Sequence, residues 1–494
     1  MEEGVIYGST PSPQVPQQNN QAAKSSIVSY AQSQTPPPKP KPKTSKLKKI
    51  LLIFLSLFLL ITVVFSLIYF ISLRSGEEAT EKVELVWWGM WEDEAIPQSI
   101  ITDFETKNPN VKVKYEYQEP AEFKEKLIAR TDAGRGPDIF RFHTNWYEDL
   151  SGILLPLTSD VITKEEFEKN YYKTAQRDLI KNGAIVGIPL EVDTLALFVN
   201  PAIIEQIKTE KELLEIKLPT NWQEFIETTE TLTTYDELGK IIIGGAGMGS
   251  YDNVNYAPDI ISLLFAQNRV DFDNFTSNQT RASDALRFYT NFALIENNVW
   301  AANIDPDLLA FSQGRLAMYY GYSKDYNQIK KSNPGLNFQV IAVPQLLSKE
   351  KFAISSYFVE GVSNASTSQA EAMLFMKFLK SPGAQEKLYQ EQLKKGIFPP
   401  PYSNKSLNEK LRGTDAYVFA QQANYALSAP FMLTPEKESR GEGMNKFIKD
   451  AVNSILSGTE PDFVTEDMFL ALTGAEPTGE ITENIPKILP EVEE

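Results

Sequence analysis

The chain of 494 residues contains no cysteine and a single histidine, His143. The absence of cysteine excludes disulfides, thiolate catalysis, cysteine-ligated zinc and an anchor lipid carried on cysteine. With one histidine, a metal site built from several histidines is excluded. The protein is therefore expected to act through carboxylates, amides, hydroxyls and aromatic rings, and no cofactor and no metal ligand set is predicted.

Positive charge is scarce over most of the chain. The formal net charge is −17, yet residues 1–74 contain eight Lys or Arg against two Glu, so the remainder carries −23. An acidic body repels phosphates, which argues against nucleic acid as a partner. Because 42% of the residues are hydrophobic, most of the chain is expected to be globular, in two or three domains.

A long apolar run lies near the N-terminus. Residues 50–73 are 24 consecutive uncharged residues, which as a helix would extend about 36 Å and cross a hydrocarbon core of about 30 Å. The alternative is a cleaved signal peptide, which has an apolar region of about 7–15 residues and a small-residue cleavage site. The run is longer, and no clean site follows it. We therefore expect a retained transmembrane anchor.

The charges that flank this run predict its orientation. Six lysines lie between Lys39 and Lys49, whereas three glutamates follow Arg74. The positive-inside rule then places the N-terminus in the cytoplasm and the body outside a cell membrane that the chain crosses once. Residues 1–49, rich in Pro, Gln, Ser and Lys, are expected to be a disordered cytoplasmic tail, and residues 74–82 a linker.

The body begins with alternating strands and helices. Strands are predicted over 83–88, 111–117 and 138–140, and helical spacing of apolar residues connects them over 96–104 and 122–132. This βαβαβ order predicts a mostly parallel α/β sheet, which binds ligands beyond the carboxyl ends of its strands.

The later part of the chain continues in the same way. Further helices are predicted over 222–232 (with Thr220 as N-cap), 281–294 and 368–379 (ended by Pro382), and further strands over 241–243, 316–320 and 338–343. The glycine-rich turn from Gly244 to Gly249 lacks the Lys-Ser/Thr ending of a phosphate-binding loop, so nucleotide binding is not expected.

Several short segments, in this order, resemble a known family. They are Val83-Glu84-Leu85-Val86-Trp87-Trp88, Asn108-Pro109, Gly136-Pro137-Asp138-Ile139, Ile188-Pro189-Leu190, Asn200-Pro201, Leu218-Pro219-Thr220-Asn221-Trp222-Gln223-Glu224 and FSQGRLAM from Phe311 to Met318. No single segment is unique, but the ordered set, spread over 83–460, resembles the extracellular solute-binding proteins of ABC importers, in the branch that contains maltose-binding protein.

The resemblance implies an α/β, two-lobe periplasmic-binding-protein-like fold with a hinge and a ligand cleft between the lobes. Lobe one is expected at 83–192 and 352–398, and lobe two at 197–345 and 403–494. The prolines Pro399 to Pro401 suit a stiff return crossing. The partners implied are a small-molecule ligand and ABC transporter permease subunits, and we expect the protein to be a monomer.

A mono- or oligosaccharide needs aromatic rings for its apolar faces and carboxylates or amides for its hydroxyls. Candidates in the loops of the first lobe are Trp88, Trp91, Glu92, Asp138 and Trp146. Trp88 has an alternative role in the lobe core, and Asp138 has one as a cap on the following turn.

The other candidates follow from the hinge and the second lobe. They are Glu191, Asp193, Tyr251, Asn253, Tyr320, Tyr322, Phe358 and Glu360. The resemblance implies that the hinge carboxylates border the cleft and that Tyr251, Tyr320 and Tyr322 match positions of cleft aromatics. The alternatives are hydrogen bonds to hinge amides for the carboxylates and a core position for Phe358.

Carbohydrate binding for an ABC importer is the predicted function, with three alternatives. A sensor ectodomain would signal through the helix, yet the tail contains no folded signalling domain. A glycoside hydrolase needs two carboxylates about 5–10 Å apart, and no such pair is recognisable in the sequence. A peptide or polyamine binder of the same fold would favour acidic cleft residues over stacking aromatics.

Overall fold

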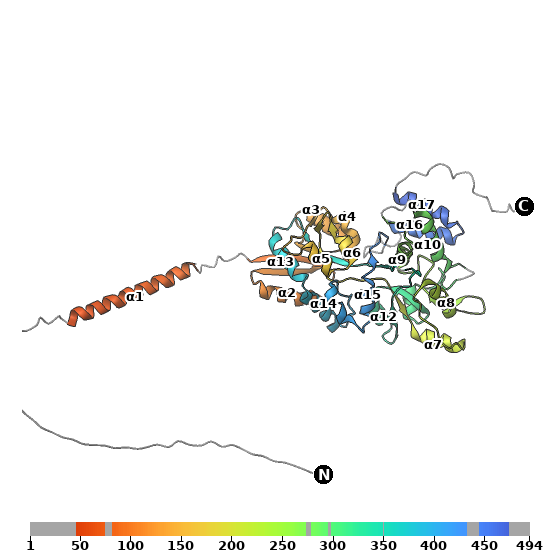
Figure 1. Ribbon diagram of the computed structural model, residues 1–494, viewed down its shortest axis with the longest axis horizontal. Coiled ribbons are helices and arrows are strands. Elements are labelled where there is room, and N and C mark those ends of the chain that lie inside the picture. The colour runs from red at the N-terminus through yellow and green to blue at the C-terminus, as the bar shows by residue number, and fades with distance from the viewer. Residues whose placement is uncertain are drawn as a thin grey trace, which may run out of the picture. The chain divides into compact units, whose positions relative to one another are not determined.

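The computed structural model describes residues 46–74, 82–272, 278–294, 298–348, 350–431 and 444–473. The chain divides into two units, Met1–Ala79 and Thr80–Glu494 (Figure 1). In the first unit, helix α1 (Lys46–Arg74) contains an apolar segment, Leu51–Phe70, of mean hydropathy 3.0. The helix begins before the predicted Ile50 because lysines favour helix. Residues 1–45 and 75–81 of the predicted tail and linker lie outside the described residues.

The second unit contains two mixed sheets. The first has the order β2-β1-β3-β14-β4, with β7 also paired to β14. Its strands are β1 (Val83–Gly89), β2 (Val111–Tyr117), β3 (Ile139–His143), β4 (Leu154–Leu155), β7 (Ile188–Pro189) and β14 (Phe358–Ser363). Strand β1 is parallel to β2 and β3, as predicted. The sheet is not mostly parallel, however, because β14 returns from the far part of the chain antiparallel to its neighbours.

Position in the sheet explains the pattern of each strand. The edge strand β2 alternates, with Val111, Val113 and Tyr115 buried and Lys112 and Lys114 exposed. Strand β1 lies between β2 and β3, so its last three residues are all buried. A central strand is covered on both faces, so side chains that point to either face are buried. Its sequence is therefore a nearly continuous apolar run.

The second sheet has the order β12-β8-β11-β10-β9. Its strands are β8 (Ala196–Val199), β9 (Thr234–Tyr235), β10 (Ile241–Ala246), β11 (Leu316–Gly321) and β12 (Gln339–Ile341). Only β10 and β11 are parallel among these pairs. Two short pairs stand apart from the sheets, β5 (Ile180–Lys181) with β6 (Ala184–Ile185) and β13 (Ala353–Ile354) with β15 (Ala426–Leu427).

Helices surround each sheet, and the two groups lie at opposite ends of the unit (Figure 1). Those of the first group are α2 (Ala95–Lys107), α3 (Phe123–Asp132), α4 (Tyr147–Leu150), α5 (Lys164–Asn170), α6 (Lys173–Leu179) and α13 (Gln369–Leu379). Those of the second are α7 (Pro201–Glu210), α8 (Trp222–Leu232), α9 (Ala257–Gln267), α10 (Gln279–Asn291), α16 (Met444–Leu456) and α17 (Pro461–Thr473). The remaining helices are α11 (Asp307–Ser312), α12 (Ser323–Ser332), α14 (Pro382–Lys394) and α15 (Ala416–Gln422), with 3-10 turns at Pro120–Glu122, Thr144–Trp146 and Lys405–Leu411.

Helix α10 is Gln279–Asn291 rather than the predicted 281–294, and two other helices have flanking residues with roles that differ from the predictions. The N-cap of α8 is Asn221, whose side chain accepts a hydrogen bond from the backbone N–H of Glu224, rather than Thr220, whose hydroxyl donates to the Glu224 carboxylate. Helix α13 ends at Leu379 as predicted. Pro382, which was predicted to end this helix, also begins the next one. Pro382 occupies the first turn of α14, where its fixed φ and missing N–H cost nothing.

Each sheet has its own hydrophobic cluster. The first extends from Leu85 to Val192 and from Tyr357 to Leu388, and the second mainly from Leu195 to Ile354 and from Phe419 to Phe469. A third, small cluster joins Tyr389 of α14 to residues from 402 to 420. Two separate clusters on one chain allow two rigid bodies to move about the segments between them.

Three chain segments cross between the two large clusters and lie side by side. They are residues 190–195, 353–357 and 398–403, which we call the hinge. The backbone N–H of Val192 donates to the Pro401 carbonyl at 2.9 Å, and that of Leu195 donates to the Ile354 carbonyl at 2.9 Å. Residues 190–195 therefore form the middle strand of the hinge.

The glycine at 245 in β10 tests the packing of the second sheet. A Cβ atom there would overlap the Thr229 carbonyl oxygen of α8, which is backbone and cannot rotate away. We expect Gly245→Ala to destabilise the protein by about 1–3 kcal/mol, the usual cost of overpacking. Thermal unfolding followed by tryptophan fluorescence measures this. Gly152→Ala, whose Cβ would meet nothing within 4 Å, is the control, and equal melting temperatures for the two variants would contradict the expectation.

Candidate functional site

A cavity of about 210 Å³ lies against the hinge and is lined by residues that pack on both large clusters. Its lining residues are Met90, Trp91, Arg141, Glu191, Asp193, Tyr322, Lys324, Ser356, Tyr357, Phe358, Gln392 and Pro400. They come from the loop after β1, from β3 and β14, from the hinge, and from the ends of α12 and α14. Aromatic rings and charged groups thus share one concave site, which is typical of a small-molecule pocket.

A buried arginine forms part of the cavity wall. Arg141 lies in β3, and its Nη2 is 2.6 Å from Oε2 of Glu191 in the hinge. Its Nη1 is 3.4 Å from Oε1 of Glu360 in β14. The guanidinium carbon also lies 4.0 Å from the ring centroid of Trp91, a cation–π contact. Arg141 therefore connects the first sheet, the hinge and an aromatic ring of the cavity.

The two carboxylates beside Arg141 have further partners. The side-chain amide of Gln392 donates to Oε1 of Glu191 at 2.7 Å, and the indole N–H of Trp87 donates to Oε2 of Glu360 at 2.8 Å. Burial raises the pKa of Glu360 to about 7, although Arg141 and the Trp87 hydrogen bond act to lower it. Such a buried pair is sensitive to the loss of either member, because the remaining charge would lack its counter-ion.

Asp193 connects the hinge to the second sheet's side of the cavity. Its Oδ2 accepts hydrogen bonds from the backbone N–H of Ser323 at 2.9 Å and from the Ser323 hydroxyl at 2.6 Å. Its Oδ1 accepts one from the backbone N–H of Thr194 at 2.9 Å. Ser323 is the first residue of α12, so the carboxylate lies at a helix N-terminus, where the exposed N–H groups favour an acceptor.

The ring of Tyr322 is held by contacts on its far side. Its hydroxyl donates to Oδ1 of Asp259 in α9 at 2.6 Å, and its backbone N–H donates to Oδ2 of Asp325 at 2.8 Å. The ring also packs edge-on against Tyr256, with centroids 5.0 Å apart. Hydrogen bonds thus fix both the backbone N–H and the hydroxyl of Tyr322, so its ring is already positioned at the cavity. Ligand binding would then cost little side-chain entropy at this residue.

Six of the residues predicted to bind ligand lie at this site. Trp91, Glu191, Asp193, Tyr322 and Phe358 line the cavity, and Glu360 is behind Arg141 in the ion-pair network. The sequence reasoning did not include Arg141, Lys324 or Gln392. A charged residue inside an apolar strand was an available signal for Arg141, whereas the two helical residues gave none.

Three predicted residues of the first lobe lie outside the lining of the cavity. The indole N–H of Trp88 donates to the Glu116 carboxylate at 2.9 Å. Asp138 accepts a hydrogen bond from the backbone N–H of Val86 at 2.8 Å and so connects neighbouring chain segments. Glu92 is exposed on the loop after Trp91. Trp88 also belongs to the first cluster, which is the alternative considered for it, whereas the hydrogen bond of Asp138 with Val86 is not the cap on the following turn that was its alternative.

The remaining four predicted residues are buried away from the cavity. Trp146 and Tyr320 are among the largest fully buried side chains, in the first and second cluster respectively. Tyr251 is also in the second cluster. The amide of Asn253 donates to the backbone carbonyl of Ala301 at 2.8 Å. Trp146 packs inside the first lobe and the other three inside the second, and none of them lines the hinge cavity.

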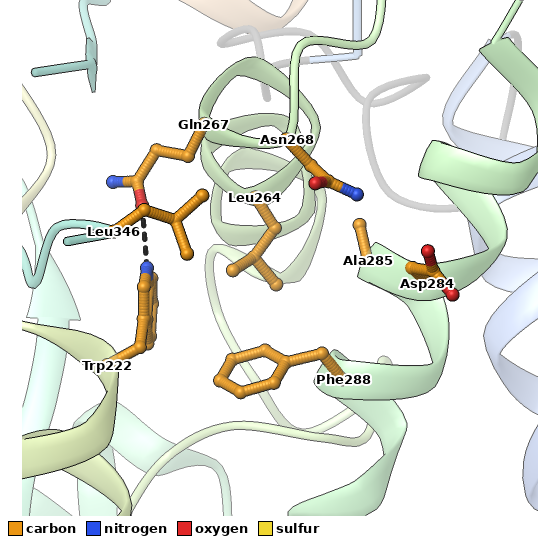
Figure 2. A pocket seen from close by; sticks show the side chains of 8 residues that line it. All are labelled: Trp222, Leu264, Gln267, Asn268, Asp284, Ala285, Phe288 and Leu346. Atoms are coloured by element: carbon orange, nitrogen blue, oxygen red, sulfur yellow. Dashed lines mark hydrogen bonds between the residues drawn. The ribbon is translucent and has the colours of Figure 1, made fainter. Parts of the chain in front are cut away.

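A second cavity, of about 190 Å³, lies within the second cluster between α8, α9 and α10 (Figure 2). Trp222, Leu264, Phe288 and Leu346 make it largely apolar, and the Trp222 indole donates to the side-chain oxygen of Gln267 at 2.6 Å. Its walls come from α8, α9, α10 and Leu346, which all lie on the second sheet's side of the hinge, so hinge movement would not reshape it. The hinge cavity is therefore the better candidate for a site that opens and closes.

The raised pKa of Asp193 predicts that the stability of the folded protein depends on pH. Burial, aided by the charge of Asp325, raises the pKa of Asp193 from 3.8 to about 7, against the lowering effect of its hydrogen bonds. Between about pH 4 and pH 7 the folded protein thus holds a proton that the unfolded chain has lost, so stability falls as pH rises. We expect the melting temperature to fall less between pH 5 and pH 8 in Asp193→Asn than in the wild type.

Melting curves of both proteins at several pH values test this expectation. Glu360 and Asp325 also have raised pKa values and contribute to the wild-type slope, so the informative quantity is the difference between the two proteins. Parallel slopes in wild type and variant would show that Asp193 titrates equally in the folded and unfolded states.

Sequence comparisons identify relatives along most of the chain. The family model for bacterial extracellular solute-binding proteins matches residues 91–386. A multiple sugar-binding protein of Streptococcus mutans is 20% identical over 401 residues, which cover 76% of this chain and 92% of that protein. A binding protein of Brucella abortus is 21% identical over 373 residues, which cover 74% of this chain and 85% of that protein.

Solved structures share the fold. A cyclo/maltodextrin-binding protein complexed with maltotetraose has a TM-score of 0.62 at 17% identity and covers 80% of this chain and 98% of its own. The sugar-binding protein MalE of Xanthomonas citri has a TM-score of 0.62 at 16% identity, with 80% and 97% covered. The predicted two-lobe, periplasmic-binding-protein-like α/β fold is thus confirmed. The chain belongs to the bacterial extracellular solute-binding protein family, the non-catalytic binding components of ABC importers.

Proposed function

We propose that this protein is a membrane-anchored, extracytoplasmic binding protein that captures a carbohydrate in the hinge cavity and delivers it to an ABC transporter permease. The observation that carries the proposal is the lining of this cavity, where Trp91 and Phe358 from the first sheet's side and Tyr322 from the second share the space with buried charged groups. Aromatic faces suit the apolar faces of sugar rings, and polar groups at the same site suit hydroxyls.

The ligands of relatives support this choice of class. The Streptococcus mutans relative is named for multiple sugars, and the structural neighbours contain maltotetraose in one case and mannobiose in another. Peptide or polyamine binders of the same fold would need an excess of unpaired acidic groups. Here Glu191 is already paired with Arg141, and Asp193 already accepts three hydrogen bonds.

The proposed mechanism is closure about the hinge. We place lobe one at 83–192 with 352–398 and lobe two at 197–345 with 403–494, because the two large clusters lie mainly within these ranges. Bending at the three hinge segments would bring Tyr322 toward Trp91 and Phe358 around a ligand. A closed, liganded form is the state that a permease would distinguish from the open one.

Ligand-induced stabilisation tests the proposal on the full chain in lauryldimethylamine oxide, a detergent without a sugar headgroup. Maltotriose, mannobiose, a mixed tripeptide and spermidine are the probes. We expect one of the sugars at 100 times its dissociation constant to stabilise the fold by about 2.7 kcal/mol. Trp91→Ala should weaken that binding by about tenfold or more through loss of the stacking face.

The control is Tyr235→Ala, which removes a half-exposed ring on β9, outside the cavity. Its affinity for the sugar should match that of the wild type. A response to tripeptide or spermidine with none to either sugar would refute the carbohydrate assignment and leave the fold assignment intact.

We further propose that α1 is a retained anchor. Its apolar segment Leu51–Phe70 would span about 30 Å at 1.5 Å per residue, the thickness of a hydrocarbon core. The chain has no cysteine that could carry a lipid anchor instead. An anchored binding protein would remain near a membrane permease without a lipid.

If α1 is retained, the mature protein should have the mass of the full chain. After expression in a bacterial host, the protein should remain in the membrane fraction after carbonate washing and keep the mass of the full chain, 55.6 kDa. A chain in which Leu60 and Leu59 are both changed to Arg should fail to integrate, because each central Arg costs about 2.5 kcal/mol or more. Release of a soluble form whose N-terminus lies just after Arg74 would instead identify α1 as a cleaved signal.

A further inference from the structure

Four charged residues line the hinge cavity, and three of them are already satisfied. Arg141 is paired with Glu191 and Glu360, Glu191 also accepts from Gln392, and Asp193 accepts its three hydrogen bonds from backbone and hydroxyl groups. Lys324 is the fourth. In the part of the chain that the structure describes, its ammonium group has no carboxylate within ion-pair distance.

The position of Lys324 is not explained by the helix that contains it. Lys324 is the second residue of α12, directly after Ser323. A cation at a helix N-terminus opposes the helix dipole, which favours anions there. Its Nζ atom lies 5.6 Å from the ring centroid of Tyr256, which is a weak cation–π contact. The side chain instead reaches the cavity wall, next to Tyr322.

The positive charge of Lys324 acts on His143, a buried residue next to the cavity. It contributes, after the larger effect of burial, to the low pKa of His143, about 3. His143 lies at the end of β3, and its Nε2 is 3.0 Å from the hydroxyl of Ser356, which lines the cavity. Closure about a ligand would remove water from this ammonium group. Lys324 is exposed in this structure and interacts with the charge of the neighbouring Asp325, but no described carboxylate lies within ion-pair distance of it. A neutral ligand that excluded water would therefore leave the ammonium group without a close counter-charge, which is costly.

We propose that the natural ligand is a carbohydrate that bears a carboxylate, such as a uronate-containing sugar, with the carboxylate on Lys324 and a sugar ring against the aromatic side chains. This inference rests on the proposed function. A monoanion matches the single unpaired cation, since the guanidinium of Arg141 is already balanced by two carboxylates. A dianionic phosphate would be left with excess negative charge beside Glu191 and Asp193.

The net charge of the protein does not oppose this match at close range. The body is acidic, but at physiological salt charges beyond about 8 Å are largely screened. The ammonium group at the cavity wall therefore has more influence on a bound carboxylate than the distant surface has. Charge-assisted hydrogen bonds of this type are also the stronger ones.

Calorimetric titration of the full chain in lauryldimethylamine oxide with matched sugars tests the inference. The pairs each differ by a single carboxylate: galacturonate with galactose, and cellobiouronate with cellobiose; maltotriose and mannobiose are added as neutral references. We expect at least one acidic sugar to bind about tenfold or more tightly than its neutral partner. Lys324→Gln should remove about that factor for the acidic sugar and change neutral binding by less than about twofold.

Two further variants make the result specific. Lys331→Gln removes a charge from the exposed end of the same helix and should leave both affinities unchanged, whereas Lys324→Arg should retain the preference for the acidic sugar. The inference is overturned if no acidic sugar binds, if the neutral partner binds as tightly, or if Lys324→Gln weakens both members of a pair equally. Binding of neutral sugars alone would overturn it and keep the proposed function, whereas binding of tripeptide or spermidine alone would overturn both.

Discussion

Arg141 is a buried cation in the middle of a β-strand, and its ion pairs connect the parts of the molecule that form the site. Glu191 belongs to the hinge and Glu360 belongs to β14, and the side-chain amide of Gln392, near the end of α14, donates to the Glu191 carboxylate. Removing a charge from water in this way is tolerated only where each partner is present. The strand order of the first sheet, with β14 next to β3, is what places Glu360 opposite Arg141.

The opposite wall of the cavity is held to the hinge by hydrogen bonds rather than by ion pairs. Asp193 accepts from the first residue of α12, and Tyr322, just before that helix, is tied to α9 through Asp259. The two walls thus meet at the middle strand of the hinge, two residues apart in sequence at Glu191 and Asp193. A small rotation of that strand would change the separation of Trp91 and Tyr322, as a hinge-closing binding protein requires.

Local sequence patterns were enough to predict much of the secondary structure and to recognise the family. The alternation in residues 111–117, the helical spacing from Ile96 to Phe104 and the uniform apolar run of α1 each reflect one short-range rule. Errors arose where a signal was shared between neighbouring elements. Pro382 both follows one helix and begins the next, and Thr220 lies one residue before the true cap, Asn221.

The sequence by itself determined that the chain has an apolar anchor-like helix, no cysteine chemistry, an acidic α/β body and the ordered segments of a solute-binding protein. Only the tertiary structure decided which of the polar and aromatic residues share a cavity. Trp91 and Trp146 look alike in sequence, yet one lines the cavity and the other is buried. The physical reason is that the cavity is assembled from segments between Met90 and Pro400, and the placement of Arg141, Lys324 and Gln392 follows from long-range strand order and hinge pairing that no local pattern encodes.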